Sequence, residues 1–191
     1  MLNLYKTIEV VISLQILIIS TMIPVFITIP ITNKVFEIVD IPITWQIPSV
    51  ILITLIFRGK IVFKAFSIYL LLGLFFIPIF HHGGSLGYIL TPNFGYLLGI
   101  YPLIKIIDDL NKHNKKITVY KFIKYGIIGI TFMHIVGITY SSIQMIYFKQ
   151  YDYLLYSISN YSFGKYGYQL LMLTPISLLL SPINNFRYKK L

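Results

Sequence analysis

The chain contains the stretch Phe57-Arg-Gly-Lys60, an apolar run from Ile61 to Phe80, the loop His81-His-Gly-Gly-Ser-Leu-Gly-Tyr88, and Thr91-Pro-Asn-Phe-Gly-Tyr-Leu-Leu-Gly99. The apolar run is about twenty residues long, which is enough for one helix to cross a bilayer. Basic residues precede the run, whereas the loop after it has no charged residue other than histidine. Glycines in that loop permit positive φ and close approach of a ligand, and its proline stiffens the path. We therefore predict a membrane span followed by a loop that covers a small solute at one membrane face.

Composition places the chain in a membrane. Of its 191 residues, 57% are hydrophobic and 12% are charged, whereas soluble domains carry about 25% charged residues. The formal net charge of +10 does not indicate nucleic-acid binding, because the basic residues cluster at the ends of apolar runs, as they do in cytoplasmic loops. The chain has no cysteine, which excludes disulfides, thiol catalysis and cysteine-ligated metals.

The apolar residues fall into successive runs that are long enough to be helices. Six such runs can be counted, at about residues 8–31, 47–57, 61–80, 94–107, 125–147 and 167–183. The first run is too long for the core of a signal peptide and lacks a small-residue cleavage site, so we interpret it as a retained span. We predict an all-α integral membrane protein with six transmembrane helices, forming a single domain over residues 1–191.

Two of the runs predict a cavity. The second and fourth are shorter than the roughly twenty residues that a straight crossing needs. Each follows a proline-containing connector, Ile41-Pro-Ile-Thr-Trp-Gln-Ile-Pro48 in one case and Thr91-Pro-Asn-Phe-Gly95 in the other. Irregular backbone at membrane depth persists only where protein buries it or where it lines a water-filled space. We therefore expect one cavity, open on the side that the two connectors share.

The basic residues predict which side that is. With the N-terminus in the cytoplasm, 13 of the 16 lysines and arginines fall on the inner side, and the outer side has only Lys34, Lys149 and Lys165. A bias of this kind sets the orientation of a membrane protein. The prediction is a multi-pass protein of the cell membrane with both termini in the cytoplasm and the cavity facing outward.

Several motifs follow one another in a recognisable order. They are Ile41-Pro-Ile-Thr-Trp-Gln46, Arg58-Gly-Lys60, Gly73-Leu-Phe-Phe-Ile-Pro-Ile-Phe80, the glycine-rich loop and Pro92-Asn-Phe-Gly-Tyr-Leu-Leu-Gly99. In this order and spacing they resemble the biotin transporter BioY family, the substrate-binding subunits (S components) of energy-coupling factor transporters. The resemblance implies six transmembrane helices and an outward-facing biotin cavity closed by two loops. It also implies a transmembrane coupling subunit and two ATP-binding cassette ATPases as partners, and no enzymatic activity or cofactor in this chain.

The last helix departs from the pattern of that family. Many members carry an Asp and, three residues later, a Lys at its start, whereas this chain reads Gly164-Lys-Tyr-Gly-Tyr-Gln-Leu-Leu171. One interpretation is that Lys165, Tyr168 and Gln169 replace the missing pair. The alternative is that the same fold binds a different vitamin or vitamin precursor.

Polar residues in the two connectors suit a biotin ureido ring. The ring offers one carbonyl acceptor and two N–H donors, which the carboxamides of Gln46 and Asn93 and the hydroxyl of Thr44 can complement. The alternative is structural: Thr44 and Gln46 cap the following helix or bond loop backbone, and Asn93 is a turn residue after Pro92.

Aromatic residues are expected to wall the rings of the ligand, although tyrosines also gather at membrane interfaces in any case. With these included, the expected biotin-binding residues are Thr44, Gln46, Phe80, Tyr88, Asn93, Phe94, Tyr96, Tyr168 and Gln169.

The remaining ionisable residues predict neither a metal site nor an enzyme. Adjacent histidines such as His81 and His82 rarely share one metal, and no carboxylate lies near them in the sequence. In the interior of the runs His134 is the one ionisable side chain besides tyrosines, since Glu9, Lys64 and Lys105 lie at cytoplasmic ends. It is a candidate for function or else a neutral histidine bonded to a neighbouring helix. Residues 108–116 are expected to form a solvated cytoplasmic loop.

Overall fold

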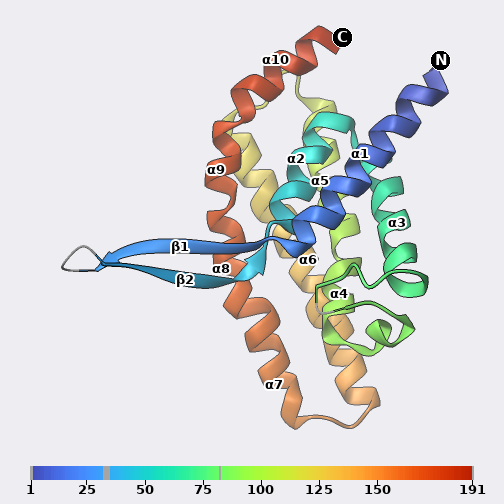
Figure 1. Cartoon of the computed structure of the whole chain (residues 1–191), viewed down its shortest axis with the longest axis vertical. Helices are drawn as coiled ribbons and strands as arrows, with labels where there is room; N and C mark the ends of the chain where they lie inside the picture. Colours follow the sequence, from blue (N-terminus) through green and yellow to red (C-terminus); the bar gives the residue numbers. More distant parts are fainter. Residues whose placement is uncertain (1, 32–34, 82, 191) are drawn as a thin grey trace.

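The fold is known from a computed structural model that describes residues 2–31, 35–81 and 83–190 (Figure 1). The residues Lys34 and His82 lie outside these ranges. The elements in chain order are α1 (Leu2–Met22), β1 (Pro24–Ile31), β2 (Val35–Thr44), α2 (Gln46–Phe57), α3 (Gly59–Phe75), η1 (Leu86–Leu90), α4 (Pro92–Leu98), α5 (Ile100–His113), α6 (Val119–Tyr147), α7 (Asp152–Ile158), η2 (Ser159–Phe163), α8 (Gly164–Leu171), α9 (Leu173–Leu178) and α10 (Leu180–Lys190).

The helices form one bundle, and α1 begins at the same end of the molecule at which α10 ends (Figure 1). Glycines let α4 and α5 approach α6 closely. A Cβ atom on Gly99 would lie 2.4 Å from the carbonyl oxygen of Met133, and one on Gly129 would lie 2.6 Å from Leu103. The close helix approach at Gly129 is therefore made within this chain. Such contacts stabilise helix bundles in lipid, where water exclusion does not drive helices together.

The first apolar run is not one helix, and the fold is not purely α-helical. Helix α1 ends at Met22, and β1 pairs antiparallel with β2 in a two-stranded sheet that projects from the bundle (Figure 1). Pro24 has no N–H with which to continue the helix. Five of the seven residues from Val25 to Ile31 are β-branched, a composition that favours strands. Because those side chains are as apolar as a helical span, hydrophobicity alone did not separate the two.

Three helix breaks follow one rule. The breaks at Gly99, Met172 and Leu179 each lie three residues before a proline, at positions 102, 175 and 182. A proline inside a helix removes the hydrogen bond to the carbonyl one turn earlier and pushes that carbonyl away. The predicted sixth span is therefore three successive helices, α8, α9 and α10.

The fourth run is longer than predicted. Helices α4 and α5 together extend from Pro92 to His113 with a break at Gly99, so only α2 is a short element behind a connector. The expectation of a solvated loop from residue 108 is wrong at its start, because Asp108 is 4% exposed. Its carboxylate accepts the backbone N–H of Gly59 at 2.7 Å and pairs with Lys112. This contact fixes the turn between α2 and α3 against the end of α5.

Two of the described helices are long and apolar enough to cross a membrane alone, at Leu4–Met22 and Val119–Tyr147. Helix α2 is a shorter apolar helix. The third run forms the 17-residue helix α3, and the proline breaks divide the fourth and sixth runs, so the six-span arrangement stays a prediction.

Candidate functional site

A cavity lies between the two connectors predicted to share one. It encloses about 670 Å³ of empty space, a volume that includes the open solvent at its mouth. Its walls come from the end of β2, the start of α2, the loop before α4, and from α4, α5, α6, η2 and α8. The lining residues are Pro42, Ile43, Thr44, Gln46, Ile47, His81, Tyr88, Asn93, Tyr96, Leu97, Ile100, Met133, Tyr161, Lys165 and Gln169.

Six of the nine expected residues line this cavity. They are Thr44, Gln46, Tyr88, Asn93, Tyr96 and Gln169. The structural alternative also applies to Thr44, because its hydroxyl accepts the backbone N–H of Gln46 at 3.4 Å.

The other three expected residues, Phe80, Phe94 and Tyr168, lie away from the cavity. Phe80 packs behind Tyr88, with ring centroids 4.7 Å apart, and is 4% exposed. The ring of Phe94 meets that of Tyr140 with centroids 5.8 Å apart. Tyr168 is 42% exposed and lines a separate surface groove.

Helix periodicity explains why Phe94 lies away from the cavity. On α4 and α5 the cavity takes Asn93, Tyr96, Leu97 and Ile100, which share one helix face at spacings of three, four and seven residues. Phe94 is one residue off that face. The same period, counted backward from Gln169, reaches Lys165 and Tyr161, which are not among the nine residues expected from the sequence.

The amide of Gln46 is held by a buried phenol. Its Nε2 donates to the Tyr69 hydroxyl at 3.3 Å. That hydroxyl also lies 3.1 Å from Thr21 Oγ1 and donates to the carbonyl of Ile79 at 3.3 Å. Tyr69 is fully buried, so it fixes the Gln46 side chain from behind and leaves the amide oxygen as an acceptor toward the cavity.

The amide of Gln169 is held in a similar way by His134. The ring atom Nε2 of His134 lies 2.8 Å from Gln169 Oε1, and Nδ1 lies 3.1 Å from Ser162 Oγ. The hydroxyl of Ser162 lies 2.6 Å from that of Tyr96. His134 is thus a buried histidine bonded to a neighbouring helix, as one of the two sequence interpretations has it.

The charge on the cavity wall comes from Lys165. Its Nζ lies 5.1 Å from the ring centroid of Tyr161. Among the described lining residues there is no carboxylate and no other lysine or arginine. Burial raises the pKa of the Tyr88 phenol to about 12, so this phenol is neutral at physiological pH. The site therefore offers amides, hydroxyls and one cation, a set that suits a small polar molecule with a negative group.

Nothing in the described part of the chain forms a group of three or more His, Asp or Glu side chains that could hold a metal ion.

Comparison with known proteins identifies relatives. The model of the BioY family matches residues 3–164. A curated protein of Lysinibacillus sphaericus named "Probable biotin transporter BioY" is 32% identical over 100 residues, which cover 52% of this chain and 51% of that protein. The chain is thus matched to about half the length of this relative. No solved structure matches it. The chain belongs to the BioY family, a family of membrane transport proteins rather than enzymes.

Proposed function

We propose that this protein is the membrane subunit that captures biotin from outside the cell for uptake. The observation that carries the proposal is the cavity itself, in which the two proline connectors, a fixed glutamine on each side and a single lysine meet. The name of the curated relative supports biotin as the ligand.

The lining residues match the parts of biotin. The ureido ring needs partners for one carbonyl and two N–H groups, and Gln46, Asn93 and Gln169 supply donors and acceptors. Leu97, Ile100 and Met133 are apolar and suit the thioether ring and the valerate chain. Lys165 is the group for the carboxylate, because a charge-assisted hydrogen bond is stronger than a neutral one.

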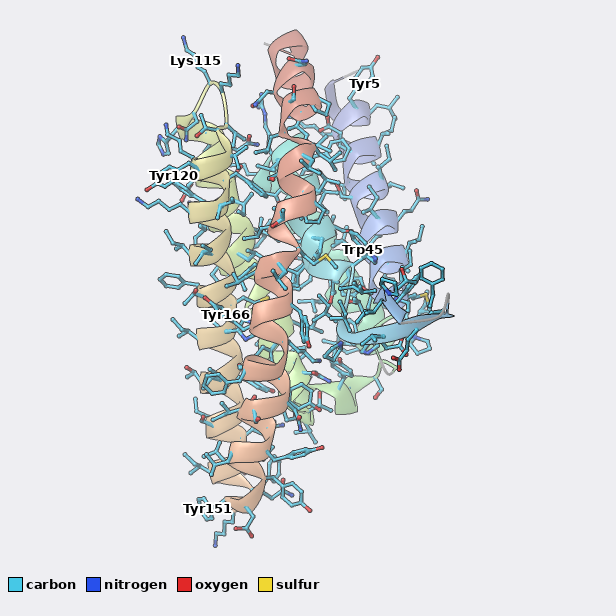
Figure 2. All side chains as sticks on the ribbon, turned by 90° about the vertical axis from the view of Figure 1, so that its left-hand side faces the viewer. Tyr5, Trp45, Lys115, Tyr120, Tyr151 and Tyr166 are labelled. Carbon is cyan, nitrogen blue, oxygen red and sulfur yellow. The ribbon has the colours of Figure 1, made fainter. Side chains whose placement is uncertain are left out.

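The placement of the cavity supports capture from the outer face. Helices α2 and α5 both start at the cavity and end near the contact between Gly59 and Asp108. The basic residues of the α5–α6 connection lie beyond that contact, and Figure 2 shows Lys115 at the opposite end of the molecule from Tyr151. Because basic loops stay in the cytoplasm, the protein would span the plasma membrane several times with both termini inside.

Release into the cell would need partner proteins. In the proposed mechanism the connectors close over biotin, and a coupling subunit with two ATP-binding cassette ATPases then reorients the loaded subunit. A ligand can drive such a change only if it contacts the two states differently. Residues 42–44 of the first connector and Tyr88 of the glycine-rich loop line the cavity, and we expect those contacts there.

A second candidate keeps the fold and changes the ligand. It is favoured by one observation: the start of the last helix carries Lys165 and Gln169 in place of the acid–base pair that many BioY members have. A different vitamin or precursor with a carboxylate and an amide would meet the same groups.

A thermal-shift panel tests the two candidates. The purified protein in detergent is heated with biotin, thiamine, riboflavin, folate, pantothenate or niacin, because a ligand at a hundred times its Kd adds about 2.7 kcal/mol of stability. Biotin alone is expected to raise the Tm. A rise with another vitamin and none with biotin would replace the first candidate by the second. Purification from native membranes then tests whether ATPase subunits accompany the chain.

A further inference from the structure

A chain of four polar side chains joins two residues of the cavity wall through the protein interior. It runs from Tyr96 on α4 through Ser162 in the π-helical turn η2 and His134 on α6 to Gln169 on α8, with distances of 2.6, 3.1 and 2.8 Å. Tyr96 and Gln169 line the cavity, whereas Ser162 and His134 are each 4% exposed. The proposed function assigns a role to Gln169 but none to Ser162 or His134.

The ring of His134 is held in one place. It meets the ring of Tyr96 edge-to-face with centroids 5.5 Å apart, and that of Tyr166 with centroids 5.2 Å apart. The hydroxyl of Tyr166 in turn lies 2.8 Å from Thr131 Oγ1. Because the ring cannot turn freely, its two nitrogens stay pointed at Ser162 and Gln169.

A neutral histidine has one N–H donor and one acceptor nitrogen, so two orders run through the whole hydrogen-bonded chain from Tyr96 to Gln169, one for each tautomer. If Nε2 carries the proton, it donates to Gln169 Oε1, and Ser162 donates to Nδ1. Tyr96 then donates to Ser162. The free amide N–H of Gln169 and the phenol oxygen of Tyr96 remain for the cavity, one as donor and the other as acceptor.

If Nδ1 carries the proton, every bond reverses. Ser162 accepts from His134 and donates to Tyr96, which leaves the Tyr96 O–H as a donor. The amide of Gln169 must turn so that its nitrogen donates to His134, which leaves its oxygen as an acceptor. In both orders the two wall groups are of opposite kinds, and a doubly protonated ring would break this pairing.

We propose that His134 is a positioning residue that sets the hydrogen-bonding polarity of the cavity wall, holding Gln169 as a donor and Tyr96 as an acceptor. The amide orientation, with Oε1 toward His134, selects the first of the two orders. Among the described residues the Nε2 of Gln169 has no other partner and is left for the cavity that this side chain lines.

With Gln169 as donor and Tyr96 as acceptor, the wall fits a ligand that presents an acceptor beside a donor. A carbonyl next to an N–H, the edge of a cyclic urea or lactam, offers an acceptor to Gln169 and a donor to Tyr96. The ureido ring of biotin has this edge, so the inference rests on the proposed function. A ring that carries a donor in place of the carbonyl leaves two donors facing each other, a mismatch that a site built for hydrogen bonding rejects strongly.

The tautomer of His134 can be measured without any ligand. The full chain is labelled with ¹⁵N-histidine, and because it has four histidines, the spectrum of His134→Gln identifies the His134 signals. We expect an unprotonated Nδ1 and a protonated Nε2. A protonated Nδ1, alone or together with Nε2, would overturn the proposal.

Ligand discrimination tests the same polarity by binding. 2-Iminobiotin replaces the ureido carbonyl with an N–H donor. The ratio of its Kd to that of biotin therefore measures how strongly the cavity wall prefers an acceptor over a donor at that position. The ratio does not depend on the fraction of folded protein. Gln169→Glu keeps an acceptor for His134 and replaces the cavity donor by an acceptor. We expect this variant to reverse the preference of the wild type for biotin, and an unchanged ratio would contradict the assignment.

Variants at position 134 separate positioning from a purely structural role. His134→Gln can still donate to Gln169 and accept from Ser162, so we expect it to keep the discrimination ratio within about threefold of the wild type. His134→Leu frees the Gln169 amide to turn, and the ratio should fall by about tenfold or more. If both variants keep the ratio, His134 only fills space. If the wild type binds no biotin, the proposed function fails, and the tautomer measurement decides the polarity by itself.

Discussion

Gln46 donates its side-chain N–H to the hydroxyl of Tyr69 over 3.3 Å, which ties the first residue of α2 to a fully buried ring on α3. The bond matters because Gln46 lines the cavity and Tyr69 does not. A residue that touches no ligand thus holds the orientation of one that we expect to do so.

Tyr69→Phe should therefore weaken biotin binding without creating a cavity in the core, because the ring is kept. Loss of one hydrogen bond to a polar group costs about 0.5–1.5 kcal/mol, so we expect Kd to rise by about three- to tenfold. Titration calorimetry measures it. The control is Tyr101→Phe, which removes the hydroxyl that lies 2.9 Å from Ser67 Oγ and should leave Kd unchanged. Equal effects of the two variants would disconnect Tyr69 from the site.

Lys165→Gln should remove the preference for a negatively charged ligand. Hydrogen bonds to charged groups contribute about 1.5–3 kcal/mol, so the wild type should bind biotin at least about tenfold more tightly than its neutral carboxamide. The variant should bind both alike. Lys124→Gln, an exposed site on α6, is the control for net charge, and a preference that survives in Lys165→Gln would place the carboxylate elsewhere.

Gly137→Ala should displace Tyr96 from the cavity wall. A Cβ atom at this position would lie 2.4 Å from the ring of Tyr96, and overpacking of this kind costs about 1–3 kcal/mol. We expect a lower Tm and weaker biotin binding. At Gly167 an added Cβ meets nothing within 4 Å, so Gly167→Ala should match or exceed the wild-type Tm. If the two variants had the same Tm and the same Kd for biotin, the close contact at Gly137 would be contradicted.

The orientation in the membrane can be read from single cysteines, because the natural chain has none. Tyr151 is 60% exposed and lies at the opposite end from Lys115 (Figure 2). In intact cells an impermeant maleimide should label Tyr151→Cys but not Lys115→Cys, which should react only after permeabilisation. The reverse pattern would turn the cavity toward the cytoplasm and remove capture from outside.

Some of the site could be predicted from sequence because its residues carry a local signal. Thr44, Gln46 and Asn93 are polar side chains in proline connectors between apolar runs, a setting in which irregular backbone has to line a cavity. Aromatic residues carry no such signal. Tyr96 and Phe94 look equivalent until the phase of α4 is known.

Other features depend on tertiary contacts that the sequence does not display. The β1–β2 hairpin was missed because strand and span residues are equally apolar, although the many β-branched residues after Pro24 were visible in the sequence. The burial of Asp108 arises from Gly59, 49 residues away. The chain from Tyr96 to Gln169 needs α4, α6, η2 and α8 to be assembled before any of its bonds exist.

Calorimetric titration of the purified full chain with biotin tests the central claim most directly. We expect saturable binding at one site per chain. Because Gln46 is an anchored polar group of the cavity, Gln46→Ala should raise Kd by about tenfold or more. A folded wild-type sample that gives no saturable heat with biotin, or a Gln46→Ala variant that binds as the wild type does, would contradict the account.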